Sequence, residues 1–260
     1  MKLGVPVSSV KGVVMKNVVL RTNAIPVYGF LSVIAARQSQ GGALPSGKIL
    51  DCGAGGPVPP LALFQQHGFE AWGIDTSEGQ LDRARQFCEE QGVELHLRRG
   101  DMRRIPFEDE TFDYLYEHYS MCHLSKQDTA LAVSEMHRVL KRGGLGFLGV
   151  ISTDSWPKSL FGEEKEPGEY WGEEGGHGLT LHAMFTDQEA DELVSAWEVV
   201  SKEKQVSYLR KAAGETSLEA WMELFGETGD RHSREEWRMR YESRSNAFQY
   251  AHLFYILRKP

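Results

Sequence analysis

Hydrophobic positions in the middle of the chain follow two alternating spacings, one typical of buried strands and one typical of amphipathic helices. Short apolar runs at residues 48–51 and 70–75 each end in an aspartate, and residues 145–151 are apolar almost throughout. Such runs are typical of strands that are covered on both faces. Further strands are expected at residues 93–97, 112–116, 198–206 and 247–257.

Helical spacing fills the intervals between these strands. Leu81, Ala84 and Phe87 recur every three or four positions, which predicts one buried helix face. Three helix starts carry a capping pair, in which a hydroxyl residue precedes an acid or amide by three positions: Ser77 with Gln80, Ser125 with Asp128, and Thr186 with Glu189. Strands joined by single helices require right-handed crossovers, so the pattern predicts an α/β fold with a parallel sheet.

The two ends of the chain have a different pattern. The first 45 residues precede the first strand, and a helix is expected near residues 27–37. Residues 153–185 carry many Gly, Pro and acidic positions without a clear period, and residues 215–245 look helical. A long irregular loop is functional or disordered, so residues 153–185 form either a lid over an apolar ligand or a solvated acidic loop. Its aromatic and histidine residues favour the lid: Trp156, Tyr170, Trp171, His177, His182 and Phe185.

Composition and charge narrow the class of protein. The 260 residues include 29 Lys+Arg and 37 Asp+Glu, a net charge of −8, which argues against a broad nucleic-acid surface. Three scattered cysteines favour a reducing compartment. The sequence shows no CxxC or HExxH motif, so no metal site is expected. We also see no signal peptide and no apolar run of about 18 residues, and therefore expect a cytoplasmic protein without a membrane span.

A glycine-rich loop follows the first expected strand, with the sequence Asp51-Cys52-Gly53-Ala54-Gly55-Gly56-Pro57. Glycines between a strand and a helix let a ligand approach the backbone closely. The N–H groups of such a loop, together with the helix N-terminus, favour a carboxylate or phosphate. A purely structural turn with small residues would have the same sequence pattern.

Two acidic positions after the next strands fit a nucleoside. Asp75, followed by Thr76, ends the second strand 22 residues after Gly53, where an acid can accept hydrogen bonds from ribose hydroxyls. Asp101 and Met102 follow the third strand, where the carboxylate can accept from an adenine amino group and the thioether can pack on the ring. The structural alternatives are a helix N-cap at Asp75 and a polar loop with one buried Met at 101–102.

The motifs in this order resemble a known family. The glycine loop and Gly73-Ile74-Asp75 are followed by the segments 100–107, Phe112-Asp113 and 138–144, the last reading Arg-Val-Leu-Lys-Arg-Gly-Gly. Residues 46–151 thereby resemble class I S-adenosylmethionine-dependent methyltransferases of the small-molecule type, the ubiquinone and menaquinone biosynthesis group among them. Two positions depart from the family pattern: Pro57 replaces the third glycine, and Arg142 replaces a proline.

The resemblance implies a fold, an activity and a domain organisation. We expect a Rossmann-like, seven-stranded, mostly parallel sheet with helices on both faces, a helical or loop cap, and residues 247–257 as the antiparallel strand. Residues 1–45 would form an N-terminal helical cap segment. Residues 46–260 would form the methyltransferase domain, with substrate-recognition inserts at 153–185 and 207–246. The cofactor would be S-adenosylmethionine and the partner a small-molecule methyl acceptor, with no nucleic acid; a homodimer is possible.

The resemblance also implies roles for individual residues. The backbone of residues 53–56 would hold the methionine part of the cofactor, with Asp51 close to its ammonium group. Glu117 and His118 would face the ammonium and the reactive methyl group through their backbone. The hydroxyl of Tyr28 would reach the cofactor carboxylate, unless this side chain serves only packing. Ribose and adenine would contact the residues already proposed for a nucleoside.

Histidines beyond the fourth strand are the candidate catalytic bases. Methyl transfer is an in-line displacement with a neutral leaving group, so positioning supplies most of the acceleration. An oxygen, nitrogen or acidic carbon acceptor also needs a base, and histidine titrates near neutral pH. His118 and His123 lie at the strand ends where parallel sheets bind ligands, with Tyr119 close by. A structural, hydrogen-bonded role for each histidine is an equal alternative.

Three other functions compete with a small-molecule methyltransferase. A nicotinamide-dependent oxidoreductase needs a glycine where this chain has Val58, and has no counterpart of the string at 138–144. A binding or regulatory protein on the same scaffold would keep the cofactor site without transfer. An RNA or protein acceptor is the third, although the Asn-Pro-Pro-Tyr string of base methylation is absent and position 117 begins Glu-His-Tyr-Ser.

Overall fold

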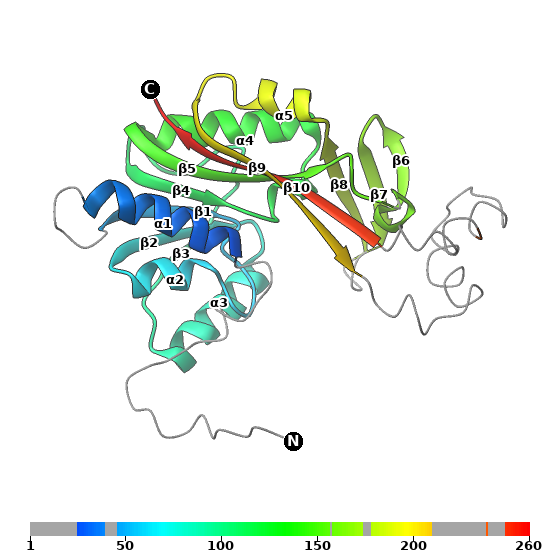
Figure 1. Ribbon diagram of the computed structural model, residues 1–260. Coiled ribbons are helices and arrows are strands. Elements are labelled where there is room, and N and C mark those ends of the chain that lie inside the picture. The colour runs from blue at the N-terminus through cyan, green and yellow to red at the C-terminus, as the bar shows by residue number, and fades with distance from the viewer. Residues whose placement is uncertain (1–24, 40–45, 157, 174–177, 210–237, 239–247) are drawn as a thin grey trace, which may run out of the picture.

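Residues 25–39, 46–156, 158–173, 178–209, 238 and 248–260 are described by the computed structural model, and they form a sheet covered by helices (Figure 1). The central strands lie in the order β3-β2-β1-β4-β5, all parallel, and antiparallel β10 pairs with β5 on one side and β9 on the other. The expected parallel sheet with a final antiparallel strand is confirmed. The seven strands are β1 (Gly47–Cys52), β2 (Phe69–Asp75), β3 (His96–Arg99), β4 (Phe112–Glu117), β5 (Leu140–Ser152), β9 (Glu198–Leu209) and β10 (Phe248–Arg258).

Alternate residues of the strands supply two separate hydrophobic cores, one on each face of the sheet. Leu50, Leu115 and Leu148 face the side covered by α4 (Lys126–Val139) and α5 (Asp187–Leu193). Tyr116 and Phe147 face the other side, which is covered by α1 (Ile25–Ser39), α2 (Leu61–Gln66) and part of α3 (Glu78–Gln91). Because both faces are buried, the strand sequences are apolar runs.

The helix at the N-terminal side is confirmed and packs on the sheet. Phe30 of α1 lies 6.1 Å from Phe64 of α2 and 5.8 Å from Phe147 of β5, measured between ring centroids. Both Phe30 and Phe64 are fully buried. Burial of one such side chain stabilises the fold by roughly 1.5–3 kcal/mol. The remaining residues of the expected cap segment 1–45 lie largely outside the described residues.

The predicted helix starts are confirmed in detail. The Ser77 hydroxyl accepts from the Gln80 N–H, and the Ser125 hydroxyl accepts from the Asp128 N–H. Thr186 and Glu189 form a complete capping box. One helix end was wrong: α4 ends at Val139, not at the glycine pair 143–144, because Leu140 is already extended and begins β5.

The segment 153–185 is not the irregular loop that its sequence predicts. It contains a short 3-10 helix η5 (Lys158–Phe161) and the strands β6 (Glu163–Glu166), β7 (Glu169–Glu173) and β8 (Leu179–Phe185). Pro167-Gly168 is the turn between β6 and β7, and Gly168 has a φ of +78°. The Gly and Pro residues therefore mark a hairpin, and the sheet has ten strands within the described residues instead of the seven expected.

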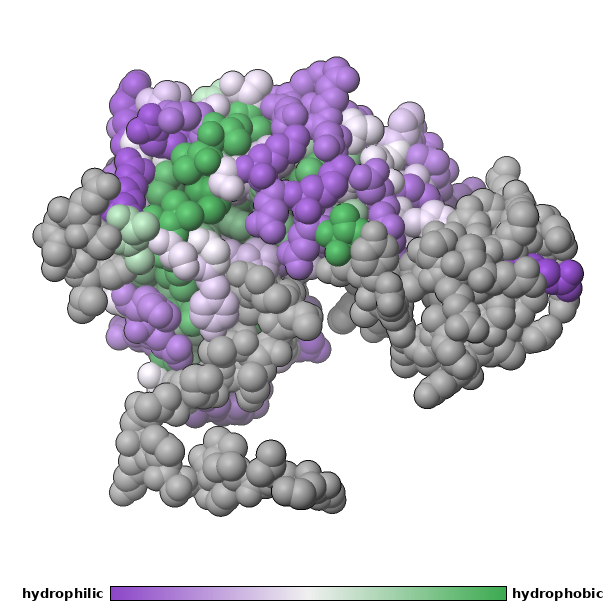
Figure 2. All heavy atoms as spheres, in the orientation of Figure 1, coloured by the Kyte–Doolittle hydropathy of each residue, from purple (hydrophilic) through white to green (hydrophobic). Residues whose placement is uncertain are grey.

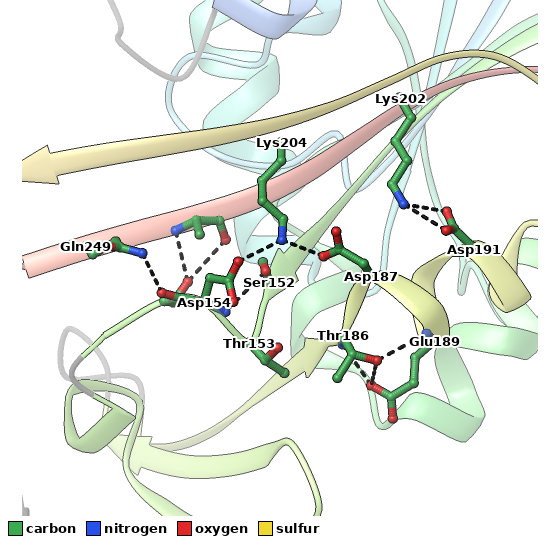
Figure 3. Close-up of polar contacts among 12 residues, drawn as sticks. Ser152, Thr153, Asp154, Thr186, Asp187, Glu189, Asp191, Lys202, Lys204 and Gln249 are labelled. Carbon is green, nitrogen blue, oxygen red and sulfur yellow. Dashed lines mark hydrogen bonds and ion pairs between the residues drawn. The ribbon is translucent and has the colours of Figure 1, made fainter.

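Lys204 of β9 joins the two ends of this segment (Figure 3). Its Nζ lies 2.7 Å from Asp154 Oδ2, just after β5, and 2.5 Å from Asp187 Oδ1, at the start of α5. The Gln249 side chain donates to the Asp154 carbonyl, and Trp156 pairs with Gln249 through the backbone. These contacts hold the hairpin segment against β9 and β10.

The outer strand β9 is exposed and charged. Residues 198–204 are exposed, and Figure 2 shows hydrophilic side chains over this strand. Lys202 and Lys204 of β9 make ion pairs with Asp191 and with the acids named above. Charged side chains on an edge strand discourage pairing with another chain. The described helices are all too short or too polar to cross a membrane.

Several expectations concern residues outside the described ones. The helix at 215–245 and most of the insert 207–246 fall there, and so does His177.

Candidate active site

A cavity of about 400 Å³ lies at the carboxyl ends of β1, β2, β3 and β4. This edge is where parallel α/β sheets bind ligands. Eight of the predicted site residues line it: Gly53, Gly55, Asp75, Thr76, Asp101, Met102, Tyr119 and His123. The lining is completed by Cys52, Ile74, Gln80, Gly100, Arg103, Ser120 and Leu124.

Two glycines of the loop are required by close packing. A Cβ on Gly53, whose φ is +134°, would lie 1.9 Å from the Ser120 hydroxyl oxygen. A Cβ on Gly55 would lie 2.5 Å from Asp75 Oδ2. Both positions therefore accept only glycine without displacing a neighbour that also lines the cavity.

The loop N–H groups have hydrogen-bond partners within the protein. Gly53 and Ala54 both donate to the Ile74 carbonyl, Gly56 donates to the Gln80 carbonyl, and Gly55 donates to Asp75 Oδ2 at 3.1 Å. That these groups bind an anion stays a prediction, and the partners they already have argue against it. What the loop offers a ligand is its carbonyl oxygens and the absence of side chains.

Asp75 connects the glycine loop to the next helix. Its Oδ2 accepts from the Gly55 N–H and its Oδ1 accepts from the Ser77 N–H at 2.8 Å. A carboxylate offers about four acceptor sites, so it can accept two hydrogen bonds from a ligand while keeping these. The helix cap itself is the Ser77 hydroxyl, so the structural alternative for Asp75 is met only in part.

Two buried carboxyl groups lie next to residues that line the cavity: Asp51 directly precedes Cys52 and Gly53, and Glu117 Oε1 accepts from the N–H of Ser120. Asp51 is 3% exposed and Glu117 is 1% exposed. Burial raises the pKa of Asp51 well above its ordinary value, and the charges of Glu117 and Asp75 raise it further. Burial raises the pKa of Glu117 to about 7, against the lowering effect of hydrogen bonds from backbone N–H groups.

One oxygen of each buried carboxyl group lacks a partner. Glu117 Oε1 accepts from the N–H groups of Ser120 and Met121, but Glu117 Oε2 and Asp51 Oδ2 have no hydrogen-bond partner among the described residues. Burying an unpaired carboxylate is costly. A positively charged donor that reaches these two groups would stabilise both in their ionised form.

Two of the three candidate catalytic residues line the cavity. His123 Nδ1 lies 3.0 Å from the Leu181 carbonyl, which can only accept, so the neutral ring carries its lone pair on Nε2. Tyr119 has a φ of +69°, which non-glycine residues rarely adopt. Burial raises the pKa of Tyr119 to about 12, so its hydroxyl is neutral at physiological pH.

His118 lies elsewhere. Its ring packs between Tyr119 and Phe254, with ring centroids 3.7 and 5.1 Å away, and it is not among the cavity-lining residues. Burial, together with the smaller effect of the charge on His252, lowers the pKa of His118 to about 3. A base this weak is a poor proton acceptor. The geometry favours the structural alternative for the His118 side chain.

Tyr28, Asp51, Ala54, Gly56 and Glu117 are also absent from the cavity lining. The Tyr28 hydroxyl is buried and has no hydrogen-bond partner among the described residues. Its ring packs against the core on the α1 side of the sheet.

Sequence reasoning missed Arg103, Ser120 and Gln80 at the cavity. Arg103 and Ser120 directly follow motifs that were recognised, so a wider window after each strand end would have found them. Gln80 was recognised only as a helix-capping residue. Its approach to Gly55 and Gly56 depends on the folded position of α3.

The fold is shared with solved methyltransferase structures. An S-adenosylmethionine-dependent methyltransferase of Methanosarcina mazei superimposes with a TM-score of 0.60 at 16% identity, over 85% of this chain and 96% of that one. The YcgJ protein of Bacillus subtilis gives a TM-score of 0.55 at 19% identity, over 90% and 99% of the two chains. The chain thus has the class I methyltransferase fold.

Sequence comparisons agree. Residues 49–144 match the family described as a methyltransferase domain. The chain is 36% identical over 98 residues to the uncharacterised methyltransferase YcgJ of Bacillus subtilis, covering 37% of this chain and 38% of that protein. It is 32% identical over 120 residues to a sarcosine/dimethylglycine N-methyltransferase of Aphanothece halophytica, covering 45% and 43%.

A third relative is a sterol 24-C-methyltransferase of Gibberella zeae, 34% identical over 108 residues, covering 40% of this chain and 27% of that protein. The matched part of the chain spans less than half the length of each of these curated relatives. The chain carries a methyltransferase domain of the S-adenosylmethionine-dependent class. The closer resemblance to the ubiquinone and menaquinone group stays a prediction.

Proposed function

We propose that the protein transfers a methyl group from S-adenosylmethionine to a small-molecule acceptor. The observation that carries this proposal is the pair of buried carboxyl groups next to the cavity lining, where Asp51 Oδ2 and Glu117 Oε2 have no hydrogen-bond partner among the described residues. The amino-acid end of the cofactor carries an ammonium group close to a sulfonium, and both are positive. Asp75 and the Asp101–Met102 pair lie along the same cavity, where ribose and adenine would bind.

The chemistry requires the chain mainly to hold reactants in line. The cofactor, when bound, supplies a methyl group on a positively charged sulfur. The tightly packed Gly53 and Gly55 keep the loop close to the ligand, and Asp75 fixes that loop to β2. Such positioning is worth up to about 7–11 kcal/mol in favourable systems.

His123 is the base we assign where the acceptor must lose a proton. It lines the cavity, and the Leu181 carbonyl of β8 selects the tautomer with an acceptor Nε2. The His118 ring packs against the Tyr119 ring and does not act as the base. The neighbouring Tyr119 shapes the cavity wall between the cofactor and the aromatic residues of β10.

Two observations support the class of acceptor: the names of the relatives, and the aromatic residues that surround Tyr119. The names of two relatives specify a sterol carbon and the nitrogen of small amino acids as acceptors. Both are small molecules. Tyr119 contacts Tyr250 and His252, so the region behind it is aromatic and uncharged, which favours an acceptor with apolar surface. The cytoplasmic location, the homodimer and the lack of nucleic-acid binding stay predictions.

Calorimetric titration with S-adenosylmethionine and S-adenosylhomocysteine tests the cofactor. Wild type is expected to bind both, and Asp75→Asn is expected to weaken binding at least about tenfold, the scale of one charged hydrogen bond. The matched control is Asp82→Asn, because Asp82 lies on the exposed face of α3 with only Arg85 as its ion-pair partner in the described chain. A screen of small acceptors with a labelled methyl group then tests transfer.

The outcomes separate the competing functions. Binding with transfer supports the proposal. Binding without transfer to any acceptor would favour a regulatory protein on this scaffold. A folded wild type that binds neither ligand would overturn the cofactor assignment.

A further inference from the structure

Arg103 is the one lysine or arginine among the described residues that line the cavity. A tight turn places it there: the Arg104 N–H donates to the Asp101 carbonyl at 3.0 Å, and the Arg103 N–H donates to Asp101 Oδ1 at 2.9 Å. The turn brings the Arg103 side chain back over the carboxylate of Asp101. The adjacent Arg104 does not line the cavity and is exposed.

Two nitrogens of the Arg103 guanidinium donate to the Asp101 carboxylate. Nε lies 3.0 Å from Oδ1 and 3.1 Å from Oδ2, and Nη2 lies 2.6 Å from Oδ2. Its third nitrogen, Nη1, lies 2.9 Å from Asp128 Oδ2 in the first turn of α4. Arg103 thereby bridges the segment after β3 to a helix 25 residues further along the chain.

This arrangement controls what Asp101 can offer a ligand. Hydrogen bonding to Arg103 holds the pKa of Asp101 below its ordinary value, so the group stays ionised and accepts hydrogen bonds without donating. Of the roughly four acceptor sites on a carboxylate, Arg103 already uses most. The side chain is therefore left with few acceptor directions, fixed in orientation by the guanidinium.

We propose that Arg103 determines the base specificity of the cavity by holding Asp101 as a fixed acceptor. The site then binds a purine with an amino group at position 6 and rejects one with a carbonyl oxygen there. This inference rests on the proposed function, because it assumes that the nucleoside part of the cofactor reaches Asp101. Arg103 is a positioning residue: it acts on the base through Asp101.

The competing role for Arg103 is direct binding of an anionic acceptor. Each of its three guanidinium nitrogens already donates to a carboxylate, and the two carboxylates that it bridges compensate its positive charge, which disfavours that role. Because the pair is still partly exposed, with side-chain exposures of 42% for Arg103 and 35% for Asp101, its effect is expected on selectivity more than on folding.

The test compares S-adenosylhomocysteine with S-inosylhomocysteine by calorimetric titration. The inosyl ligand has a carbonyl oxygen in place of the 6-amino group and a hydrogen on N1, so it presents an acceptor where the adenosyl ligand presents a donor at position 6. Wild type is expected to prefer the adenosyl ligand at least about tenfold, the ratio that one charge-assisted hydrogen bond provides. Arg103→Gln is expected to reduce this preference to about threefold or less. Arg103→Lys keeps the charge but lacks the planar guanidinium, so its preference for the adenosyl ligand should lie between those of wild type and Arg103→Gln. Arg104→Gln is the matched control and should keep the wild-type ratio.

A double-mutant cycle shows whether Arg103 acts through Asp101. In the Asp101→Asn background, Arg103→Gln should change the adenosyl-to-inosyl ratio no further, since the two residues act as one unit. If Arg103→Gln loses affinity equally for both ligands, so that their ratio is preserved, the inference is contradicted and Arg103 has a structural or anion-binding role.

The titrations distinguish a failure of the base-specificity inference from a failure of the proposed function. Equal wild-type affinity for the two ligands overturns the base-specificity inference and leaves the proposed function standing. Absence of adenosyl binding by a folded wild type overturns the proposed function itself. Thermal unfolding of every variant confirms that the ratio is measured on folded protein.

Discussion

Two regions next to the cavity bury titratable groups of opposite kinds, acids in one and bases in the other. The first holds the carboxyl groups of Asp51 and Glu117, whose pKa values burial raises. Behind Tyr119 lies a neutral aromatic–histidine cluster made of His118, Tyr119, Tyr250, His252 and Phe254. Burial lowers the pKa of His118 to about 3 and of His252 to about 4. In both regions desolvation favours the neutral form of the group.

The two regions differ in what a ligand would change. His118 Nε2 and His252 Nε2 also lack a hydrogen-bond partner among the described residues, but burial keeps both rings uncharged, and His252 stacks on Phe254 with an angle of 4° between ring planes. A buried carboxyl group with an oxygen unpaired in the described chain is stabilised by any cationic donor that reaches it. Under the proposed function, the acidic region would therefore bind a positively charged ligand group, and the cluster would contact an apolar part of the acceptor.

The largest expected effect is on the pH dependence of stability, which has opposite signs in the two regions. The folded pKa of Glu117, about 7, exceeds its ordinary value of 4.5. The folded protein therefore binds more protons between these values, and this stability, about 3 kcal/mol, is lost as pH rises toward 7. His252 changes from 6.5 to about 4, so its contribution is gained as pH rises through that window.

Urea unfolding between pH 4.5 and 7 measures both signs. The slope of the free energy of unfolding against pH should be more positive in Glu117→Gln than in wild type. In His252→Phe the same slope should be more negative than in wild type. Glu89→Gln, on the exposed face of α3, is the control. If both variants shift the slope in the same direction, the contrast between the two regions is wrong.

The second effect concerns the close packing of the loop. Gly53→Ala should weaken S-adenosylmethionine binding about a hundredfold, near 2.7 kcal/mol, since the new Cβ meets the Ser120 side chain and φ is +134°. Gly79→Ala is the matched control, because its nearest neighbour lies 4.0 Å away. Calorimetry on both variants checks this, and equal affinities would show that Ser120 moves aside.

The third effect tests the acidic region directly. Wild-type affinity for S-adenosylmethionine should increase as pH rises through about 7, because Glu117 then ionises without ligand assistance. Glu117→Gln should weaken binding above that pH by about tenfold and remove most of the pH dependence. A titration series across pH 6–8 measures it. An unchanged profile would assign the cationic site to Asp51 alone.

The smallest effect concerns the hairpin segment on the cluster side. Lys204→Met should destabilise the protein by about 0.5 kcal/mol, because surface ion pairs contribute little, and should accelerate hydrogen exchange of β8 amides. Lys202→Met removes one ion pair that does not touch the segment's ends and serves as control. Cofactor affinity should be unchanged in both. A loss of affinity in Lys204→Met would show that the regions are not independent.

Local signals predicted the acidic region better than the cluster. Asp75 and the glycine loop are recognisable because strand ends, glycines and helix caps act over a few residues. The caps at Ser125 and Thr186 were confirmed for the same reason. The engagement of every loop N–H was not predictable, since Ile74 and Gln80 provide the acceptors only after the strands and α3 have packed.

The cluster side depends on residues far apart in the chain. His118 is packed against Phe254, with ring centroids 5.1 Å apart, and Gly149 leaves room for its ring, because a Cβ at position 149 would lie 3.1 Å from His118 Cδ2. Its sequence neighbourhood alone left a catalytic and a structural role open. Likewise, the hairpin at 163–185 was hidden because β8 is buried along most of its length and therefore shows no polar alternation.

The hairpin segment leaves and rejoins the sheet at the same place. Ser152 is paired with Phe185 in the register of β5 and β8, and the Thr153 N–H donates to the Phe185 carbonyl at 3.0 Å. A segment whose ends are neighbours can be lengthened, shortened or exchanged without shifting the strands that carry the glycine loop. Evolution, or a protein engineer grafting a different hairpin, can thus change the wall beside His123 and leave the strands β1 to β4 and the glycine loop unaltered.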